Sequence, residues 1–219
     1  MSKLLSEFEP ISVKSEIWSA QKGNLRSTAL RLRDGSLCLY SPVLGLGGRA
    51  KSSLSKLGEV SHLLAPNHYH NKGLREYSEA FPEAKLICSD RARPRLAKQT
   101  GLSFKSLQTV EPLLPESHKL AEPDGLKTGE TWLMVDNTSE LIWIVCDSFK
   151  GPDGTVGHVG ENVGMLGTFP SYAIKDAQAY TTWINAKIDV ATPSMIVPCH
   201  GAIVQSENLA VDILSLLAR

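Results

Sequence analysis

The chain has 219 residues, of which 42% are hydrophobic and 21% are charged, a profile typical of a globular protein with a sizeable core. Lys plus Arg and Asp plus Glu both number 23, so no net charge attracts nucleic acid or an anionic membrane, and neither is expected as a partner. The longest apolar runs, such as 141–146, are too short to cross a bilayer, and Glu7 interrupts the N-terminal segment before a signal-peptide core can form.

This length suits one domain that spans residues 1–219. The four cysteines, at positions 38, 88, 146 and 199, form no Cys-x-x-Cys pair, and three of them lie inside apolar, strand-like runs. A free cysteine in such a run behaves as a small hydrophobic residue. We therefore expect reduced thiols, which favours a cytoplasmic protein.

The first half of the chain predicts a β-hairpin followed by alternating helices and strands. The hairpin turns at Asp34-Gly35, a strong short-range turn signal. The elements expected in chain order are strands 25–33 and 36–41, helix 49–57 ending at Gly58, strand 61–66, helix 74–80, strand 84–89 and a helix from Pro94 to Gly101.

The second half repeats this pattern after a proline-rich segment, 109–127, that is expected to be a loop. The later elements are a hairpin of strands 130–136 and 140–146 around 137–139, a glycine-rich surface loop 151–167, an amphipathic helix 176–188, strand 194–198, and a helix capped by Ser206 that runs to about 217. Strand pairs followed by helices, twice over, predict two packed sheets with helices outside. The hairpins 25–41 and 130–146 should lie in different sheets.

Three of the apolar strands end in histidine or aspartate. The segment 67–73 (Asn-His-Tyr-His-Asn-Lys-Gly) follows the first, Asp147 follows the second, and His200 follows Val197-Pro198-Cys199. Side chains at strand ends lie where loops converge, and histidine with aspartate is a ligand set for zinc or non-haem iron. We therefore expect Asp147 and His200 to approach each other and to share a metal, a water molecule or a hydrogen bond.

From about Leu25 to the C-terminus, the elements follow a fixed order: a strand, His-x-His, a loop and a helix, then a hairpin strand that ends in Asp, then a helix and a strand that ends in Pro-x-His-Gly. This order resembles the metallo-β-lactamase superfamily. The resemblance implies an α/β fold of four layers, an αββα sandwich. More narrowly, Ser41-Pro42, Ala65-Pro66-Asn67-x-x-His70 and Phe81-Pro82-x-Ala84 resemble a branch defined only as a domain of unknown function. That branch implies a fold and no particular reaction.

The resemblance also implies a set of metal ligands. Catalytic members of the superfamily hold two ions through His-x-His-x-Asp-His, a later histidine, a bridging aspartate and a final histidine. Here His68 and His70 match the His-x-His pair, Asp147 matches the bridging aspartate with its catalytic role, and His200 matches the final histidine.

The chain departs from this pattern at two places. Lys72-Gly73 stands where Asp-His is expected, and a cation there would repel a second metal ion. Gly129-Glu130-Thr131 stands where the later histidine is expected, so Glu130 either supplies an oxygen ligand instead or begins a surface strand.

The register of the first motif is open between two alternatives. Alignment of the strand ends, in place of the histidines, puts Asn67 and Tyr69 at the first two ligand positions and leaves His68 and His70 outside the site. His158, in the glycine-rich loop, is either a substrate contact or a solvated loop residue.

Two functions are compatible with these residues. The first is a metal-dependent hydrolase that binds at most one divalent ion (zinc, iron or manganese), in which metal-bound water attacks a carbonyl or phosphoryl centre. A catalytic zinc needs about three protein ligands, and the chain offers few more than that. The second is a non-catalytic, metal-free relative that uses the cleft to bind a small-molecule ligand or a partner, and the missing Asp-His favours it.

Overall fold

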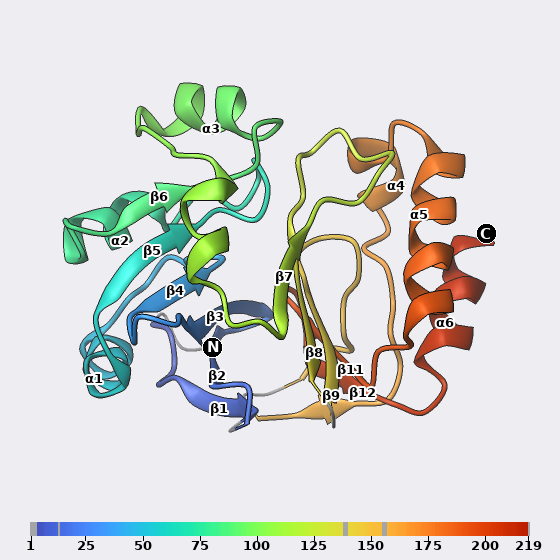
Figure 1. Cartoon of the computed structure of the whole chain (residues 1–219), viewed down its shortest axis with the longest axis horizontal. Coiled ribbons are helices and arrows are strands. Elements are labelled where there is room, and N and C mark those ends of the chain that lie inside the picture. The colour runs from blue at the N-terminus through green and yellow to red at the C-terminus, as the bar shows by residue number, and fades with distance from the viewer. Residues whose placement is uncertain (1–3, 13, 138–139, 155–156, 219) are drawn as a thin grey trace.

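Two six-stranded sheets face each other with helices on both outer sides, in a computed structural model that describes residues 4–12, 14–137, 140–154 and 157–218 (Figure 1). The first sheet has the order β1-β2-β3-β4-β5-β6 and the second the order β10-β12-β11-β9-β8-β7. This is the four-layer αββα arrangement expected from the sequence.

The first sheet combines an antiparallel half, β1 to β4, with a parallel half, β4 to β6. Its strands are β1 (Glu9–Ser12), β2 (Ile17–Lys22), β3 (Leu25–Arg31), β4 (Leu37–Tyr40), β5 (Val60–Leu64) and β6 (Lys85–Ile87). Three helices cover its outer side: α1 (Gly48–Leu57), α2 (Leu74–Ala80) and α3 (Arg93–Thr100). The parallel strands need long crossovers, and α1 and α2 provide them.

The second sheet is built around the parallel pair β9 and β11. Its strands are β7 (His118–Ala121), β8 (Trp132–Asn137), β9 (Glu140–Val145), β10 (Val159–Gly160), β11 (Met195–Pro198) and β12 (Ile203–Gln205). The helices α4 (Phe169–Ala173), α5 (Ala177–Val190) and α6 (Leu209–Leu217) cover its outer side. Two short 3-10 helices, Leu107–Thr109 and Glu111–Leu113, precede β7.

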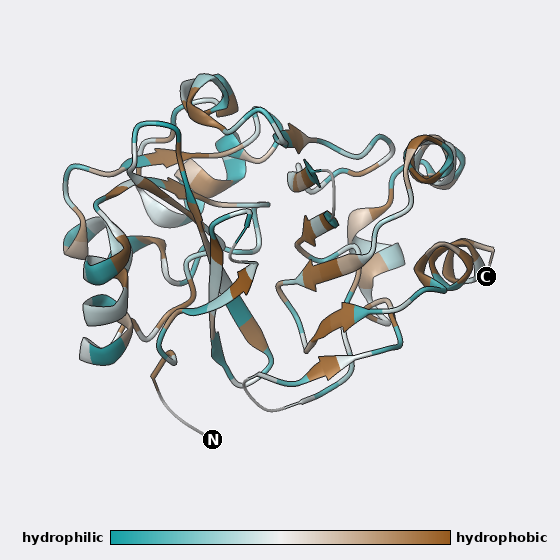
Figure 2. Ribbon diagram, turned by 60° about the horizontal axis from the view of Figure 1, so that its bottom comes forward, coloured by the Kyte–Doolittle hydropathy of each residue, from teal (hydrophilic) through white to brown (hydrophobic). Residues whose placement is uncertain are grey.

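Both faces of the central strands are buried, which explains why β9 is an unbroken apolar run from Leu141 onward. Ile142 and Ile144 point into the core between the sheets, whereas Trp143 and Val145 pack in the cluster that also holds Ile184 of the covering helix α5. A strand that is buried on both faces needs no polar positions. The strands of the second sheet accordingly show long hydrophobic stretches in Figure 2.

The structure confirms several expectations. The hairpins β3–β4 and β8–β9 lie in different sheets, and α2 has the predicted bounds. The turn of the second hairpin was predicted at 137–139, and residues 138–139 lie outside the described residues. The four cysteines are free and buried. Within the described ranges, no helix is long and apolar enough to span a membrane.

Three expectations about local structure were wrong. The predicted loop 109–127 contains β7, which pairs with β8, and the predicted loop 151–167 contains β10. Both strands are too short for an alternating pattern to show in the sequence. The last helix begins at Leu209 with Asn208 as its N-cap, and the Ser206 hydroxyl instead accepts a hydrogen bond from the Asn208 N–H at 3.1 Å.

Candidate metal centre

The strand ends of both sheets converge at one end of the sandwich. The parallel register of β9 and β11 pairs Val145 with Pro198, so the segments that follow these strands leave the second sheet together. The loop that follows β5 brings residues 67–73 to the same place from the first sheet. The backbone joins the sheets there, because the Arg26 N–H donates to the Cys199 carbonyl at 2.9 Å.

Three side chains from these loops meet atom to atom. Asp147 Oδ1 lies 3.0 Å from His70 Nε2 and 3.0 Å from His200 Nε2, and the two Nε2 atoms are 3.2 Å apart. The two imidazole rings are perpendicular, at 90°. The side chain of Asp147 is only 4% exposed and that of His70 11%. The predicted approach of Asp147 and His200 is therefore confirmed.

This triangle has the dimensions of one face of a metal tetrahedron. Ligand atoms at about 2.0–2.1 Å from a tetrahedral zinc ion are about 3.3–3.4 Å from one another. The observed separations, 3.0–3.2 Å, need only a slight expansion to admit an ion. Two imidazoles and a carboxylate also form a donor set that divalent transition metals accept.

The outer atoms of these side chains are fixed by neighbours. The Ser41 hydroxyl lies 2.9 Å from His70 Nδ1, and Asn67 Nδ2 donates to Asp147 Oδ2 at 2.8 Å. Contacts of this kind orient a ligand and set which imidazole nitrogen is free to coordinate. Ser41 is held in the left-handed region, at φ 57°, a conformation that is uncommon for residues other than glycine and concentrates at functional sites.

Gly73 stands where the superfamily pattern has the histidine of Asp-His, when His68 and His70 are aligned with His-x-His. The structure explains why no side chain is found at this position. A Cβ atom there would lie 2.3 Å from the carbonyl oxygen of Pro42 and 2.8 Å from the backbone nitrogen of Leu44. No side chain fits in that space unless the backbone moves. The close contact instead places the loop that carries His70 directly against the end of β4.

The charges in this cluster stabilise one another. Burial alone would raise the pKa of Asp147, but hydrogen bonds from His200 and His70 hold it well below its usual range. Burial would lower the pKa of His70, but Cys199 and Asp147 raise it well above its usual value. The charged form of His70 is therefore favoured, and ion binding must displace its proton.

His68 does not join this cluster. It is buried, its Nε2 lies 3.2 Å from Arg95 Nη1, and its ring packs edge-on against Tyr69. Burial, and then the charge of Arg95, lower its pKa to about 4. The observed register thus matches neither alternative in full, because Asn67 and His70 face the centre and His68 faces helix α3.

We expect His68 to make the folded chain sensitive to acid. The pKa of His68 is about 4 in the folded chain against 6.5 for an ordinary histidine, so between these values the unfolded chain binds more protons. The contribution of His68 to the free energy of unfolding should be complete above about pH 6.5 and should be lost as the pH falls toward 4. Urea unfolding at pH 7.5 and 5.0 should show that the free energy of unfolding falls less between these pH values for His68→Gln than for the wild type. The exposed His158→Gln is the control, and equal losses in all three proteins would contradict the expectation.

Glu130 lies under the centre and contacts the backbone. It is 1% exposed, and its Oε1 accepts hydrogen bonds from the N–H groups of Cys146 and Ser148 and from Trp132 Nε1, whereas Oε2 accepts one from the Asp147 N–H. Burial and Asp147 raise its pKa to about 7, against the effect of these donors. The structure gives Glu130 neither of the two predicted placements, because it is neither in the triangle nor at the surface.

A cleft of about 640 Å³ opens above the centre. Its lining is mostly apolar and includes His70, Asp147 and His200 on its floor. The other lining residues are Lys22, Leu25, Pro42, Val43, Leu44, Tyr69, Asn71, Lys72, Gly73, Leu166 and Tyr172. Lys72 is exposed at the rim, and His158 lies elsewhere, beside a separate cavity of about 210 Å³.

Tyr172 is a cleft residue that no sequence pattern predicted. It comes from α4, and its ring packs edge-on against Tyr69 with centroids 5.0 Å apart. Burial and the neighbouring carboxylate of Asp147 raise its pKa. Pro170 at the start of α4 was the available signal, because proline is frequent in the first turn of a helix.

Comparison with known proteins supports the fold. No family model and no curated protein sequence matches the chain. The metallo-β-lactamase from Pontibacter korlensis is similar over 97% of this chain and 100% of its own, with a TM-score of 0.61 and 12% identity. The DIM-1 metallo-β-lactamase is similar over 98% of both chains, with a TM-score of 0.62 and 11% identity.

A third similar structure is the metal-soaked Flv1 flavodiiron core from Synechocystis, with a TM-score of 0.59 and 11% identity. It matches 98% of this chain, but this chain covers only 62% of it. The chain therefore has the metallo-β-lactamase fold, as its sequence predicted. The narrower resemblance to a domain of unknown function stays a prediction.

Proposed function

We propose that this chain is a metal-dependent hydrolase, folded as one domain, that binds a single divalent ion through His70, Asp147 and His200. The observation that carries the proposal is the triangle of donor atoms with sides of 3.0–3.2 Å on the floor of the cleft. The fold adds support, because one similar structure is a flavodiiron core that was soaked with metal. The donor set suits zinc, iron or manganese.

The residues around the triangle have distinct roles in this proposal. An ion at this place would lower the pKa of a bound water molecule and polarise the carbonyl or phosphoryl group under attack. Ser41 holds Nδ1 of His70 and so leaves Nε2 for the ion, and Asn67 holds the second oxygen of Asp147. The lining of the cleft is mostly apolar, and Tyr172 lies beside Asp147.

The ligand supply limits the chain to one ion. Two ions that share Asp147 would need at least two further ligands, and neither His68 nor Glu130 faces the triangle. Lys72 lines the cleft, so its positive charge disfavours a second cation. The buried free thiols also support a reducing, cytoplasmic setting.

Metal analysis tests this proposal. After dialysis against zinc, manganese or iron(II), the protein should retain about one equivalent of metal and no more. A panel of p-nitrophenyl esters and phosphodiesters should be hydrolysed only by the loaded protein, and a chelator should stop the reaction until metal is restored. Two tightly held equivalents would contradict the ligand count, and no retained metal would contradict the proposal.

A metal-free binding protein is the second candidate. It is favoured by one observation, that Asp147 and the two histidines satisfy one another through hydrogen bonds without an ion. In that case the cleft would bind a small molecule or a partner in the presence of a chelator. The amount of metal in the purified protein separates the two candidates.

A further inference from the structure

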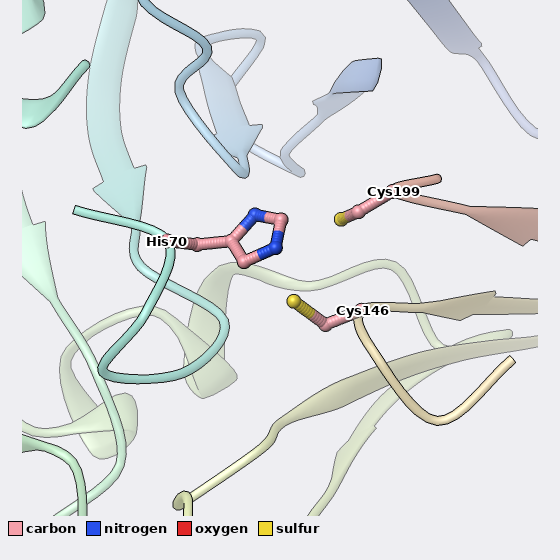
Figure 3. A group of neighbouring side chains, drawn as sticks. All are labelled: His70, Cys146 and Cys199. Atoms are coloured by element: carbon pink, nitrogen blue, oxygen red, sulfur yellow. The ribbon is translucent and has the colours of Figure 1, made fainter. Parts of the chain in front are cut away.

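Two cysteines lie directly beside the proposed metal ligands. Cys146 precedes Asp147 and Cys199 precedes His200, and the register of β9 and β11 brings the two cysteines side by side. The Cys199 N–H donates to the Val145 carbonyl at 3.0 Å. Both thiols point toward the imidazole of His70 from the ends of these strands (Figure 3).

The two thiols and His70 form a second donor set. One ring nitrogen of His70 and the sulfur atoms of Cys146 and Cys199 all lie within 4.8 Å of one another. In a tetrahedral zinc site with Zn–S distances of about 2.3 Å, two sulfur atoms are about 3.8 Å apart. The two sulfur atoms would therefore need to approach each other by about 1 Å at most, which small rotations of the side chains about χ1 can supply.

The surroundings of this set are not purely apolar. Asn67 Nδ2 lies 3.3 Å from Cys146 Sγ as well as 2.8 Å from Asp147 Oδ2, so one amide contacts both donor sets. Cys38 and Cys88 are also buried, yet they belong to neither of the donor groups found among the described residues. Cys146 and Cys199 therefore differ from these two thiols by their position, although all four are buried.

We propose that His70, Cys146 and Cys199 form an alternative site for a thiophilic ion such as zinc or cadmium. This site depends on the proposed function in one respect, because both donor sets include His70. An ion bound to one set occupies that imidazole, so the other set cannot bind an ion at the same time. Soft thiolate ligands select zinc-like and softer ions, whereas carboxylate oxygen suits manganese. The chemical nature of the ion thus decides which set is filled.

Cobalt(II) is the probe for this site, because it replaces zinc and reports its ligands by absorption. Titration of the reduced, full-length protein should give intense thiolate-to-cobalt charge-transfer absorption in the near ultraviolet at one equivalent. The ligands must be deprotonated to coordinate, so binding should release protons into a weakly buffered solution and should tighten as the pH rises. These readouts do not depend on any catalytic activity.

Matched variants identify the sulfur ligands. Cys146→Ser and Cys199→Ser should each weaken the charge-transfer band, and the double variant should lose it. Cys38→Ser, which changes another buried thiol of the core between the sheets, should retain the band, as should Asp147→Asn. Retention of the band in the double variant, or its loss in Cys38→Ser alone, would overturn the assignment.

X-ray absorption on the zinc-loaded wild type gives a second test that needs no variant. Zinc in this site should show Zn–S distances of about 2.3 Å, whereas zinc in the His70, Asp147 and His200 set should show only Zn–N and Zn–O distances of about 2.0–2.2 Å. One bound ion without sulfur would overturn this inference and leave the proposed function intact. No bound ion would overturn both.

Discussion

Replacement of His70 by glutamine should lower the affinity for a divalent ion by about 100-fold or more, and hydrolysis should fall with it. Even residues that only orient a ligand typically cost 10–100-fold in metal affinity when they are changed, and His70 contacts both other members of the triangle directly. It also belongs to both donor sets. Isothermal titration with zinc and with manganese would measure the change.

His68→Gln is the matched control for this variant, because the two histidines are two positions apart on the same loop. His68 contacts Arg95 and not the triangle, so its replacement should change ion affinity only a few-fold. If His68→Gln instead removed the ion while His70→Gln retained it, the assignment of His70 as the ligand would be refuted. Equal losses in both variants would point to a general collapse of the loop.

Replacement of Glu130 by glutamine should destabilise the chain by about 1–3 kcal/mol, the typical cost of one orphaned buried hydrogen-bonding group. A glutamine carbonyl at Oε1 can keep the three bonds made there, but its amide then faces the Asp147 N–H, which is also a donor. Glu130→Ala orphans all four donors and should cost more. Chemical unfolding with urea measures both losses.

Glu140→Gln provides the comparison for Glu130. Glu140 accepts hydrogen bonds from the hydroxyls of Ser12 and Ser15, which can rotate to a new partner, and it is only partly buried. Its replacement should cost less than about 1 kcal/mol. If both glutamine variants cost the same, the position of Glu130 beneath the centre would have no special importance for stability.

Sequence patterns predicted the strands that carry the site because those strands are buried and end abruptly. The run that ends at Asp147 is apolar on both faces, and the run that ends at His200 contains a proline and is followed by Gly201, which adopts φ 83°. Burial and turn chemistry are local properties of a sequence, so such strand ends can be predicted.

The choice between His68 and His70 depended on contacts that no local pattern contains. His68 and His70 lie two positions apart in one loop and point in different directions. Contacts with Arg95 from α3 and with Ser41, directly after β4, decide these directions. The position of Glu130 was equally hidden, because three of its four partners lie 16 to 18 positions further along the chain. Tertiary partners of this kind cannot be predicted from one sequence.

An ion at the triangle would act as a cross-link between two halves of the chain. His70 comes from the first sheet and Asp147 and His200 from the second, so the sheets cannot separate at this end until the ion leaves. A ligand present at 100 times its dissociation constant stabilises a fold by about 2.7 kcal/mol. The lifetime of this protein in a cell would then follow the local metal supply, because the metal-free chain would be less stable and more exposed to proteases.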